Sequence, residues 1–331
     1  MTRISENQIA RAILTDIIRN REAVAKYTEE VSSGKKVLDP GDSKQAGTVA
    51  QFQDSLGKIQ SYRDRIAISE AFVAYQENIL SESSELLIRA KEIATQGANE
   101  TNSETERAQL AQEVYEIREH MVTLANSKYQ GRYIYSGARD NTPAYSPANP
   151  PYTVPASGLA ADRYTYDIVA PGRLLSRTVQ VTEDLSVTVN TPGNGVFDEA
   201  IQALERLGRA LGGYQTNPAV GAPDGTGVAY TFPADYDLQT ADIQNVMGLL
   251  DTARERDLMP ERTNLAGRLR RLQTAESILE VSEVTAREVL AQLQDADLIV
   301  SASRLTEAQT ALQASLTVTA QVLRQSIMDY L

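Results

Sequence analysis

The sequence predicts a mainly α fold: a long antiparallel helical rod formed by the N- and C-terminal regions, with a small central α+β insert domain at its tip. Three observations lead to this prediction. Ten of the 12 prolines lie between Pro143 and Pro233, so two long outer stretches are free of helix breakers. Apolar residues in the outer stretches recur at steps of three, four and seven, which is a helical spacing. The central stretch instead contains short alternating fragments that are typical of strands.

The first predicted helix carries one apolar seam. Its positions step by seven, or by three and four, along the chain: Ala10, Ile13, Ile17, Val24, Tyr27 and Val31. A break follows between Ser32 and Gly47, and a second helical stretch runs to about Gly97. Because a single helix with a narrow apolar seam is marginal in water, this seam needs a partner.

A further helix begins after Ser103. Glu106 follows three residues later, and such a pair satisfies free amides at a helix start. The apolar positions after this cap alternate steps of four and three: Leu110, Val114, Ile117, Met121 and Leu124. The spacing is typical of a coiled coil or a bundle, and we interpret this stripe as ordinary core.

The C-terminal region, from about Leu238 to Leu331, repeats the pattern. Its first part has leucines at 265, 269, 272 and 279. In its second part Leu298, Leu305 and Leu312 step by seven, and a second row at an offset of four comprises Leu316, Leu323 and Tyr330. Both chain ends therefore carry seams, and the economical partner for each end is the other.

The central stretch reads as a separate module. Thr178 to Val181 and Leu185 to Val189 alternate like strands, whereas Phe197 to Leu211 carries one apolar helical stripe that stops at Gly212-Gly213. The loop from Asn217 to Gly227 is expected to face solvent. We expect three parts: a terminal coiled-coil assembly domain (1–40 with 300–331), a helical rod domain (41–139 with 241–299) and a central α+β insert domain (140–240).

Composition argues against several function classes. The formal net charge of -12 disfavours nucleic acid and anionic membranes as partners. The chain has no cysteine and a single histidine, His120. Two pairs of aspartates, Asp235 with Asp237 and Asp295 with Asp297, lack the glycine and glutamate of a calcium loop. No nucleophile, base and metal-ligand constellation is present, so we expect no enzyme activity, no cofactor and no metal.

The sequence also lacks the marks of the common membrane and secretion signals. Residues Met1 to Ile18 have no basic start, continuous apolar core or cleavage site, so no cleaved signal peptide is expected. A run of about 18 apolar residues, as a membrane-spanning helix requires, does not occur.

Several segments resemble the bacterial flagellin-like family. Val31 to Val37 followed by Asp39 to Asp42 is similar to the turn after the first helix of flagellins, and so is Ala94 to Asn99 through Ser103. Two further segments, Gly131 to Gly137 and the stretch from Thr310 to the final Asp-Tyr-Leu, resemble the hook-associated subunits of the hook–filament junction more than flagellin. The resemblance covers about two thirds of the chain and only a small part of the insert.

The resemblance implies a structural role outside the cell. A ring of such subunits joins the hook-side junction protein (hook-associated protein 1) to flagellin, after export without cleavage through the flagellar type III apparatus and with the help of an export chaperone. The terminal segments would then fold as coiled coils on entering the assembly. The residues expected at this interface are Ile13, Ile17, Val24, Val31, Leu298, Leu305, Leu312, Leu316, Leu323 and Tyr330.

Two alternatives stay open. The chain could instead be a flagellin-type subunit of the filament body, which shares the helical rod but polymerises on its own. A third reading is a binding module, in which the tyrosine-rich insert recognises a surface or a glycan. Extension into long homopolymers would favour flagellin, and deletion of Pro143 to Pro233 would test the role of the insert.

Overall fold

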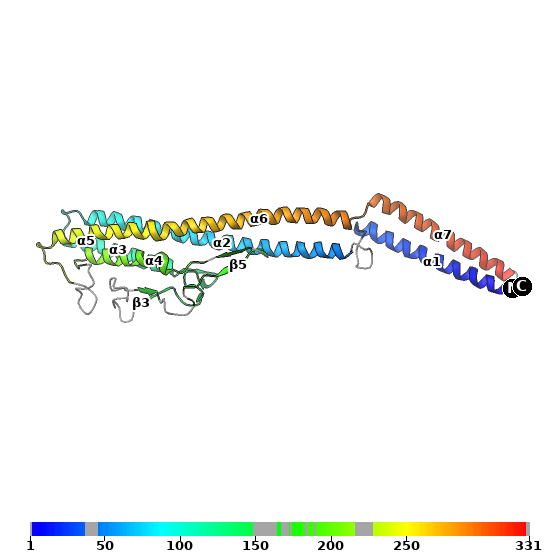
Figure 1. The fold of residues 1–331 in the computed structure, drawn as a ribbon, viewed down its shortest axis with the longest axis horizontal. Coiled ribbons are helices and arrows are strands. Elements are labelled where there is room, and N and C mark those ends of the chain that lie inside the picture. Colours follow the sequence, from blue (N-terminus) through cyan, green and yellow to red (C-terminus); the bar gives the residue numbers. More distant parts are fainter. Residues whose placement is uncertain are drawn as a thin grey trace. The chain divides into compact units, whose positions relative to one another are not determined.

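The computed structural model describes residues 2–36, 46–147, 164–166, 172, 174–182, 185–188, 190–215 and 228–328. Helices dominate these residues (Figure 1). The chain forms two compact units: unit 1 comprises Met1–Ser61 with Leu279–Leu331, and unit 2 comprises Tyr62–Ile278. The prediction of a mainly α fold in which both chain ends are helical is confirmed.

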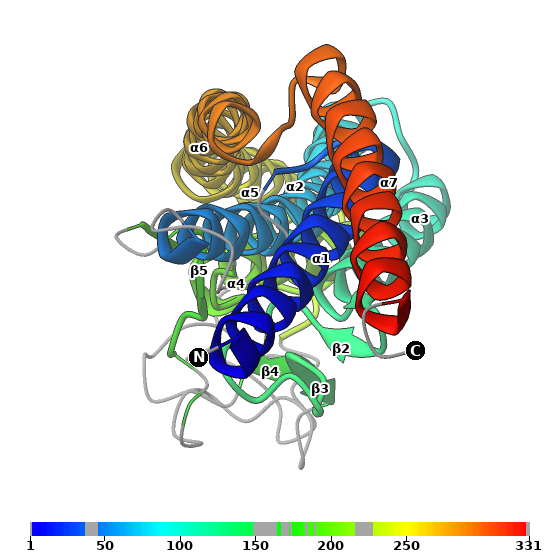
Figure 2. The same cartoon turned by 90° about the vertical axis from the view of Figure 1, so that its right-hand side faces the viewer.

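Unit 1 is built on two long terminal helices. Helix α1 (Thr2–Ser33) packs along α7 (Leu298–Met328), and Figure 2 shows the two side by side. Their cross-contacts join Asn20 to Ser315 and Glu30 to Ser301, which is an antiparallel order. The N-terminal seam therefore has the partner that the sequence predicts, namely the C-terminal end of the same chain.

The ends of these two helices are defined locally. Gly34 follows α1 with φ +71°, a left-handed conformation that favours glycine, and its N–H donates to the carbonyl of Glu30 at 2.9 Å. At the start of α7 the carboxylate of Asp297 accepts the backbone N–H groups of Ile299 and Val300, at 3.0 and 3.2 Å. An aspartate cap of this kind satisfies amides that a helix start leaves without partners.

Unit 1 also contains parts of two other helices. Helix α2 (Ala46–Gly97) begins here, and helix α6 (Met259–Gln294) ends here. Ala46 and Val49 are buried against Leu290 and Leu293. Residues 37–45, which include the flagellin-like Asp39 to Asp42, lie outside the described part of the chain.

Unit 2 adds three further helices: α3 (Glu104–Ala125), α4 (Asn194–Leu211) and α5 (Tyr236–Thr252). The predicted cap of α3 is confirmed, since the Ser103 N–H donates to the Glu106 carboxylate at 2.7 Å and the Glu106 N–H donates to the Ser103 hydroxyl at 3.3 Å. Val114 and Met121, on the predicted stripe of this helix, are fully buried, so the stripe is core.

Helix α4 packs closely on α3. It carries the apolar stripe predicted for Phe197 to Leu211 and ends before Gly212-Gly213, as expected. A Cβ at Gly208 would lie 2.4 Å from the ring of Tyr115, so glycine permits the close approach of the two helices. Beside this contact, Arg118 of α3 and Glu205 of α4 form an ion pair that is buried on both sides.

In the described part of the chain the strands form three short antiparallel pairs. Their members are β1 (Lys128–Tyr129) with β2 (Arg132–Tyr133), β3 (Tyr145–Pro147) with β4 (Tyr164–Tyr166), and β5 (Thr178–Gln180) with β6 (Ser186–Thr188). The last pair falls on the two fragments predicted as strands. The tight β1–β2 turn places Gln130 and Gly131 at positive φ, as a two-residue hairpin requires. The loop expected to face solvent, Asn217 to Gly227, lies outside the described residues.

A π-helical segment connects α5 to α6. Segment η2 (Ala253–Leu258) precedes Pro260, which lies in the first turn of α6. The N–H of Met259 donates to the carbonyl of Arg254, five residues back. Proline has no N–H to donate to the preceding turn and would interrupt a regular α-helix. The π-helical segment widens the chain for one turn before Pro260, so the helix continues past it without a break.

Candidate assembly surface

The seam between α1 and α7 contains six of the predicted interface residues. On α1 these are half-buried and recur along one face of the helix: Ile13, Ile17, Val24 and Val31. On α7 Leu305 and Leu312 are half-buried as well. Up to Thr319 the remaining seam positions of α7 are small or polar, with Ser301 and Ala308 buried and Ser315 and Thr319 half-buried, and Val322 beyond them is half-buried too. The two helices therefore approach each other closely along a narrow strip.

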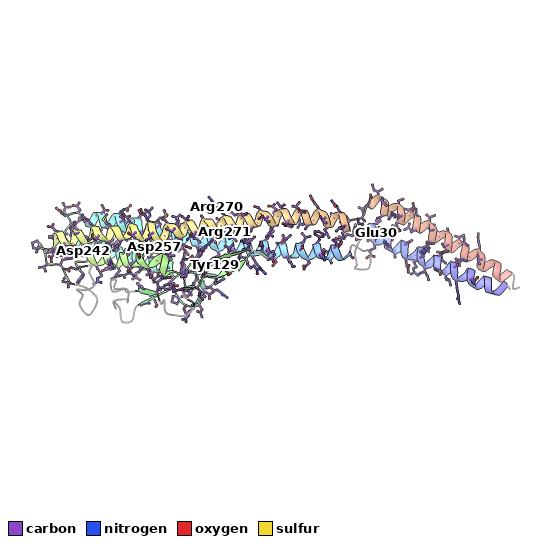
Figure 3. The ribbon with its side chains drawn as sticks, in the orientation of Figure 1. Glu30, Tyr129, Asp242, Asp257, Arg270 and Arg271 are labelled. Atoms are coloured by element: carbon purple, nitrogen blue, oxygen red, sulfur yellow. The ribbon has the colours of Figure 1, made fainter. Side chains whose placement is uncertain are left out.

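Two polar contacts lie inside this seam among the side chains that the structure describes. Asn20 Nδ2 donates to Ser315 Oγ at 2.8 Å, and Ser301 Oγ donates to Glu30 Oε2 at 2.9 Å. Glu30, labelled in Figure 3, is only 8% exposed. A buried polar group costs free energy unless its partner is aligned, so these two contacts favour one register of α1 against α7.

Two predicted residues lie outside the seam. Leu298 and Leu316 are 52% and 50% exposed. Leu298 lies in the first turn of α7. Leu316 directly follows the half-buried Ser315, so its side chain leaves the helix about 100° away from the seam. The side chain of Leu323 and the whole of Tyr330 lie outside the described residues. Both exposed leucines are available to a second protein, so they stay predictions for an assembly interface.

Sequence reasoning missed a second apolar stripe on the same helices. On α1 Leu14 and Ile18 are 58% and 57% exposed, and on α7 Ile299, Val300 and Val318 are exposed too. The sequence does indicate these residues, because apolar residues occur there at consecutive positions, as in Ile13-Leu14, Ile17-Ile18 and Leu298-Ile299-Val300. At about 100° per residue, Leu14 and Ile18 share one face of α1 and Leu298 and Leu316 share one face of α7, whereas Val300 and Val318 are turned by about 200° from these two leucines. Exposed apolar residues that share a face indicate a second contact. We call Leu14, Ile18, Leu298 and Leu316 the exposed stripe.

The described residues contain little that resembles catalytic chemistry. His120 Nε2 lies 3.1 Å from Glu82 Oε1, and both side chains are about half exposed. Within the described ranges no group of three or more His, Asp or Glu side chains is placed to hold a metal ion. No helix in those ranges has the length and apolar content to cross a membrane.

The carboxyl group of Asp198 in unit 2 has a pKa above its ordinary value. Burial raises the pKa of Asp198 to about 6, and the neighbouring carboxylates of Asp257 and Glu199 add to this rise. The hydroxyl of Tyr145 donates to Asp198 Oδ1 at 2.5 Å, which opposes it. The arrangement joins α4 to the β3 strand.

Comparison with known proteins agrees with this architecture. The bacterial flagellin N-terminal helical region matches residues 4–140. The chain is 24% identical to flagellar hook-associated protein 3 of Escherichia coli (strain K12), over 95% of this chain and 94% of the relative. It is 28% identical to the protein of the same name from Salmonella typhimurium, over 45% of this chain and 48% of that relative.

A solved structure and a flagellin complete the comparison. The crystal structure of flagellar hook-associated protein 3 from Legionella pneumophila superposes with a TM-score of 0.56 at 16% identity, covering 75% of this chain and 99% of that chain. A flagellin of Clostridium tyrobutyricum is 25% identical, over 38% of this chain and 33% of the relative. The resemblance inferred from the motifs is thus confirmed: the chain is similar to flagellar hook-associated protein 3 along nearly its whole length, and residues 4–140 match the N-terminal helical region of bacterial flagellins.

Proposed function

We propose that this chain is a structural, non-catalytic subunit of the bacterial flagellum that joins the hook to the flagellin filament. The observation that carries the proposal is the extent of the similarity. The match to hook-associated protein 3 spans 95% of the chain, whereas the flagellin match spans 38%. The flagellin alternative is therefore less supported.

The exposed stripe supports an assembly role on physical grounds. Fully burying one leucine or isoleucine contributes about 1.5–3 kcal/mol, so covering the exposed half of Leu14 or Ile18 contributes about 1 kcal/mol. Summed over the four residues of the stripe, a neighbour that covers them gains about 3–6 kcal/mol before the cost of association. A free chain leaves this surface in water, and an assembled chain removes it.

The partners follow from the proposed position. The subunit contacts the hook-side junction protein (hook-associated protein 1) on one side, flagellin on the other and further copies of itself in a ring, and an export chaperone holds it before secretion. It acts outside the cell, after passage through the flagellar type III apparatus.

The division of labour within the chain is part of the proposal. Residues 1–40 with 300–331 form the assembly domain, 41–139 with 241–299 form the rod, and 140–240 form the insert. Nine of the ten predicted interface residues belong to the first of these parts, and Leu298 lies at the end of the second. The insert serves as an outer surface, apart from α4, which packs on α3 of the rod.

A pair of neighbouring substitutions tests the role of the terminal seam. Leu312→Asp places a charge in the half-buried seam, whereas Gln313→Asp places the same charge at an exposed position of the same turn. In a strain that lacks the native gene, we expect the first variant to be secreted but to leave hooks without filaments, and the second to restore filaments. Removal of all residues from Leu305 onward should likewise leave hooks without filaments. Filaments on the hooks of the Leu312→Asp strain would contradict the proposal.

A second experiment separates the junction subunit from flagellin. Purified protein is added to filament seeds, and filament length is measured by electron microscopy. A junction subunit caps the seed or adds a short segment, whereas a flagellin extends it into long filaments. Long homopolymers would overturn the proposal in favour of the alternative.

A further inference from the structure

A cavity of about 320 Å³ lies in unit 2, where it is bounded by helix α2, the β1–β2 hairpin and strand β5. Its lining combines apolar side chains, such as Phe72 and Tyr129, with the two arginines Arg132 and Arg177. Figure 3 labels Tyr129 beside α2. A cavity of this size that combines apolar side chains with a few polar groups suits a small molecule. We call it the hairpin cavity.

The aromatic side chains of the hairpin cavity are already packed against one another. The ring of Tyr129 meets the ring of Phe72 edge-on, with their centroids 5.2 Å apart, and its centroid lies 5.6 Å from that of Tyr75. The register of the hairpin places Tyr129 opposite Arg132, so both side chains leave the hairpin on the same face. A ring that is held in this way loses little freedom when a ligand packs on it, which favours binding.

The two arginines of the cavity share one carboxylate. Arg132 Nη1 and Arg177 Nη1 lie 3.0 and 3.1 Å from the same oxygen, Asp140 Oδ2. Among the described residues neither arginine has a second carboxylate partner. A guanidinium has five N–H donors, so each arginine keeps donors for a further acceptor, and one of the two positive charges lacks a counter-charge there. This arrangement favours a ligand that carries one carboxylate.

The turn of the hairpin adds an amide to the cavity. Gln130 lines it, is exposed and has φ +50°. The turn requires a positive φ at this position, and glycine, asparagine or aspartate suits such a position better than glutamine. The chain thus has a glutamine side chain where the geometry of the turn alone disfavours it. Because an amide both donates and accepts hydrogen bonds, it suits a hydroxyl group of a ligand.

We propose that the hairpin cavity binds an acidic sugar, with the chemistry of a uronic acid. The carboxylate of the sugar binds Arg132 and Arg177, while the C–H face of its ring packs on Tyr129. One of its hydroxyl groups binds the amide of Gln130. An acid without hydroxyl groups would leave this amide without a partner, and a neutral sugar would leave the additional positive charge without one. The described lining belongs to unit 2, so the site does not depend on the terminal helices.

Isothermal titration calorimetry on the purified full-length chain tests the proposal with three compounds. D-Glucuronate has a ring, hydroxyl groups and a carboxylate, whereas D-glucose lacks the carboxylate and benzoate lacks the hydroxyl groups. We expect glucuronate to bind at one site per chain and at least tenfold more tightly than glucose or benzoate. A trimer of uronic acid units that binds more tightly still would identify a polysaccharide as the source of the sugar, and equal affinity would identify a single sugar. Absence of saturable glucuronate binding, or equal binding of the three compounds, would overturn the proposal.

Matched variants locate the site in the same assay. Gln130→Gly should unfold at about the temperature of the wild type, because relief at the positive φ offsets the greater freedom of glycine in the unfolded chain, yet it should weaken glucuronate binding. Arg132→Gln/Arg177→Gln should weaken binding at least tenfold. Arg270→Gln/Arg271→Gln removes two charges from exposed positions of α6 outside the cavity and should leave binding unchanged. Unchanged binding in either of the first two variants, or equal losses in the two double variants, would overturn the proposal.

Discussion

Removal of one partner of the buried Arg118–Glu205 pair should strongly destabilise unit 2. The side chains of Arg118 and Glu205 are 3% and 4% exposed, so water cannot replace a lost partner. The Arg118 guanidinium also lies 4.8 Å from the centroid of the Tyr115 ring. Breaking a buried pair costs about 3–5 kcal/mol, because the remaining charge stays buried without compensation. We therefore expect Arg118→Met to lower the free energy of unfolding of unit 2 by about 3–5 kcal/mol.

The double variant Arg118→Met/Glu205→Leu provides the decisive comparison. Replacing both charges by apolar side chains of similar volume removes the cost of burying them, so stability should return to within about 1–2 kcal/mol of the wild type. Urea denaturation followed by circular dichroism measures all variants in the same buffer. A single variant that loses less than about 1 kcal/mol, or a double variant no more stable than the single one, would refute this reasoning.

Three further predictions concern unit 2 and use the same assay. Ser103→Ala should cost about 1 kcal/mol, because it removes the cap of α3, and a loss near zero would contradict the cap. Gly208→Ala should cost about 1–3 kcal/mol, because the new methyl group collides with the Tyr115 ring, whereas Gly248→Ala should stabilise by about 1 kcal/mol; equal effects would contradict the packing described. The folded-state pKa of Asp198, about 6, is above the ordinary value of 3.8, so protonation of Asp198 stabilises the fold. The free energy of unfolding should therefore fall by about 2–3 kcal/mol from pH 4 to pH 6. Asp198→Asn should remove this dependence on pH.

Local signals predicted the elements of this fold well. The capping pair Ser103 and Glu106 and the stripe of α4 each depend on residues a few positions apart, so each is readable from sequence. The mainly α fold also followed from the proline distribution. The π-helical turn before Pro260 was not predicted, because a helix break and a widened turn are both compatible with proline at that position.

Pairings between distant residues were beyond sequence reasoning. Arg118 and Glu205 lie 87 positions apart, and nothing near either residue indicates the other. On α7 the row of leucines in the sequence includes Leu316, whereas the side that faces α1 carries Ser315 instead. Heptad counting locates apolar rows, but small polar residues also suit a seam in which two helices approach closely.

Incorporation of stripe variants into the flagellum tests the central claim most directly. Leu14→Asp/Ile18→Asp places two charges on the exposed stripe, and Thr28→Asp/Ser32→Asp places two charges on exposed polar positions of the same helix with the same spacing. Both variants are first shown to be secreted as well as the wild type and to have the same helical content. Hooks with attached filaments are then counted by electron microscopy. The account predicts bare hooks for the first variant and attached filaments for the second. Filaments attached normally in the first variant would contradict it.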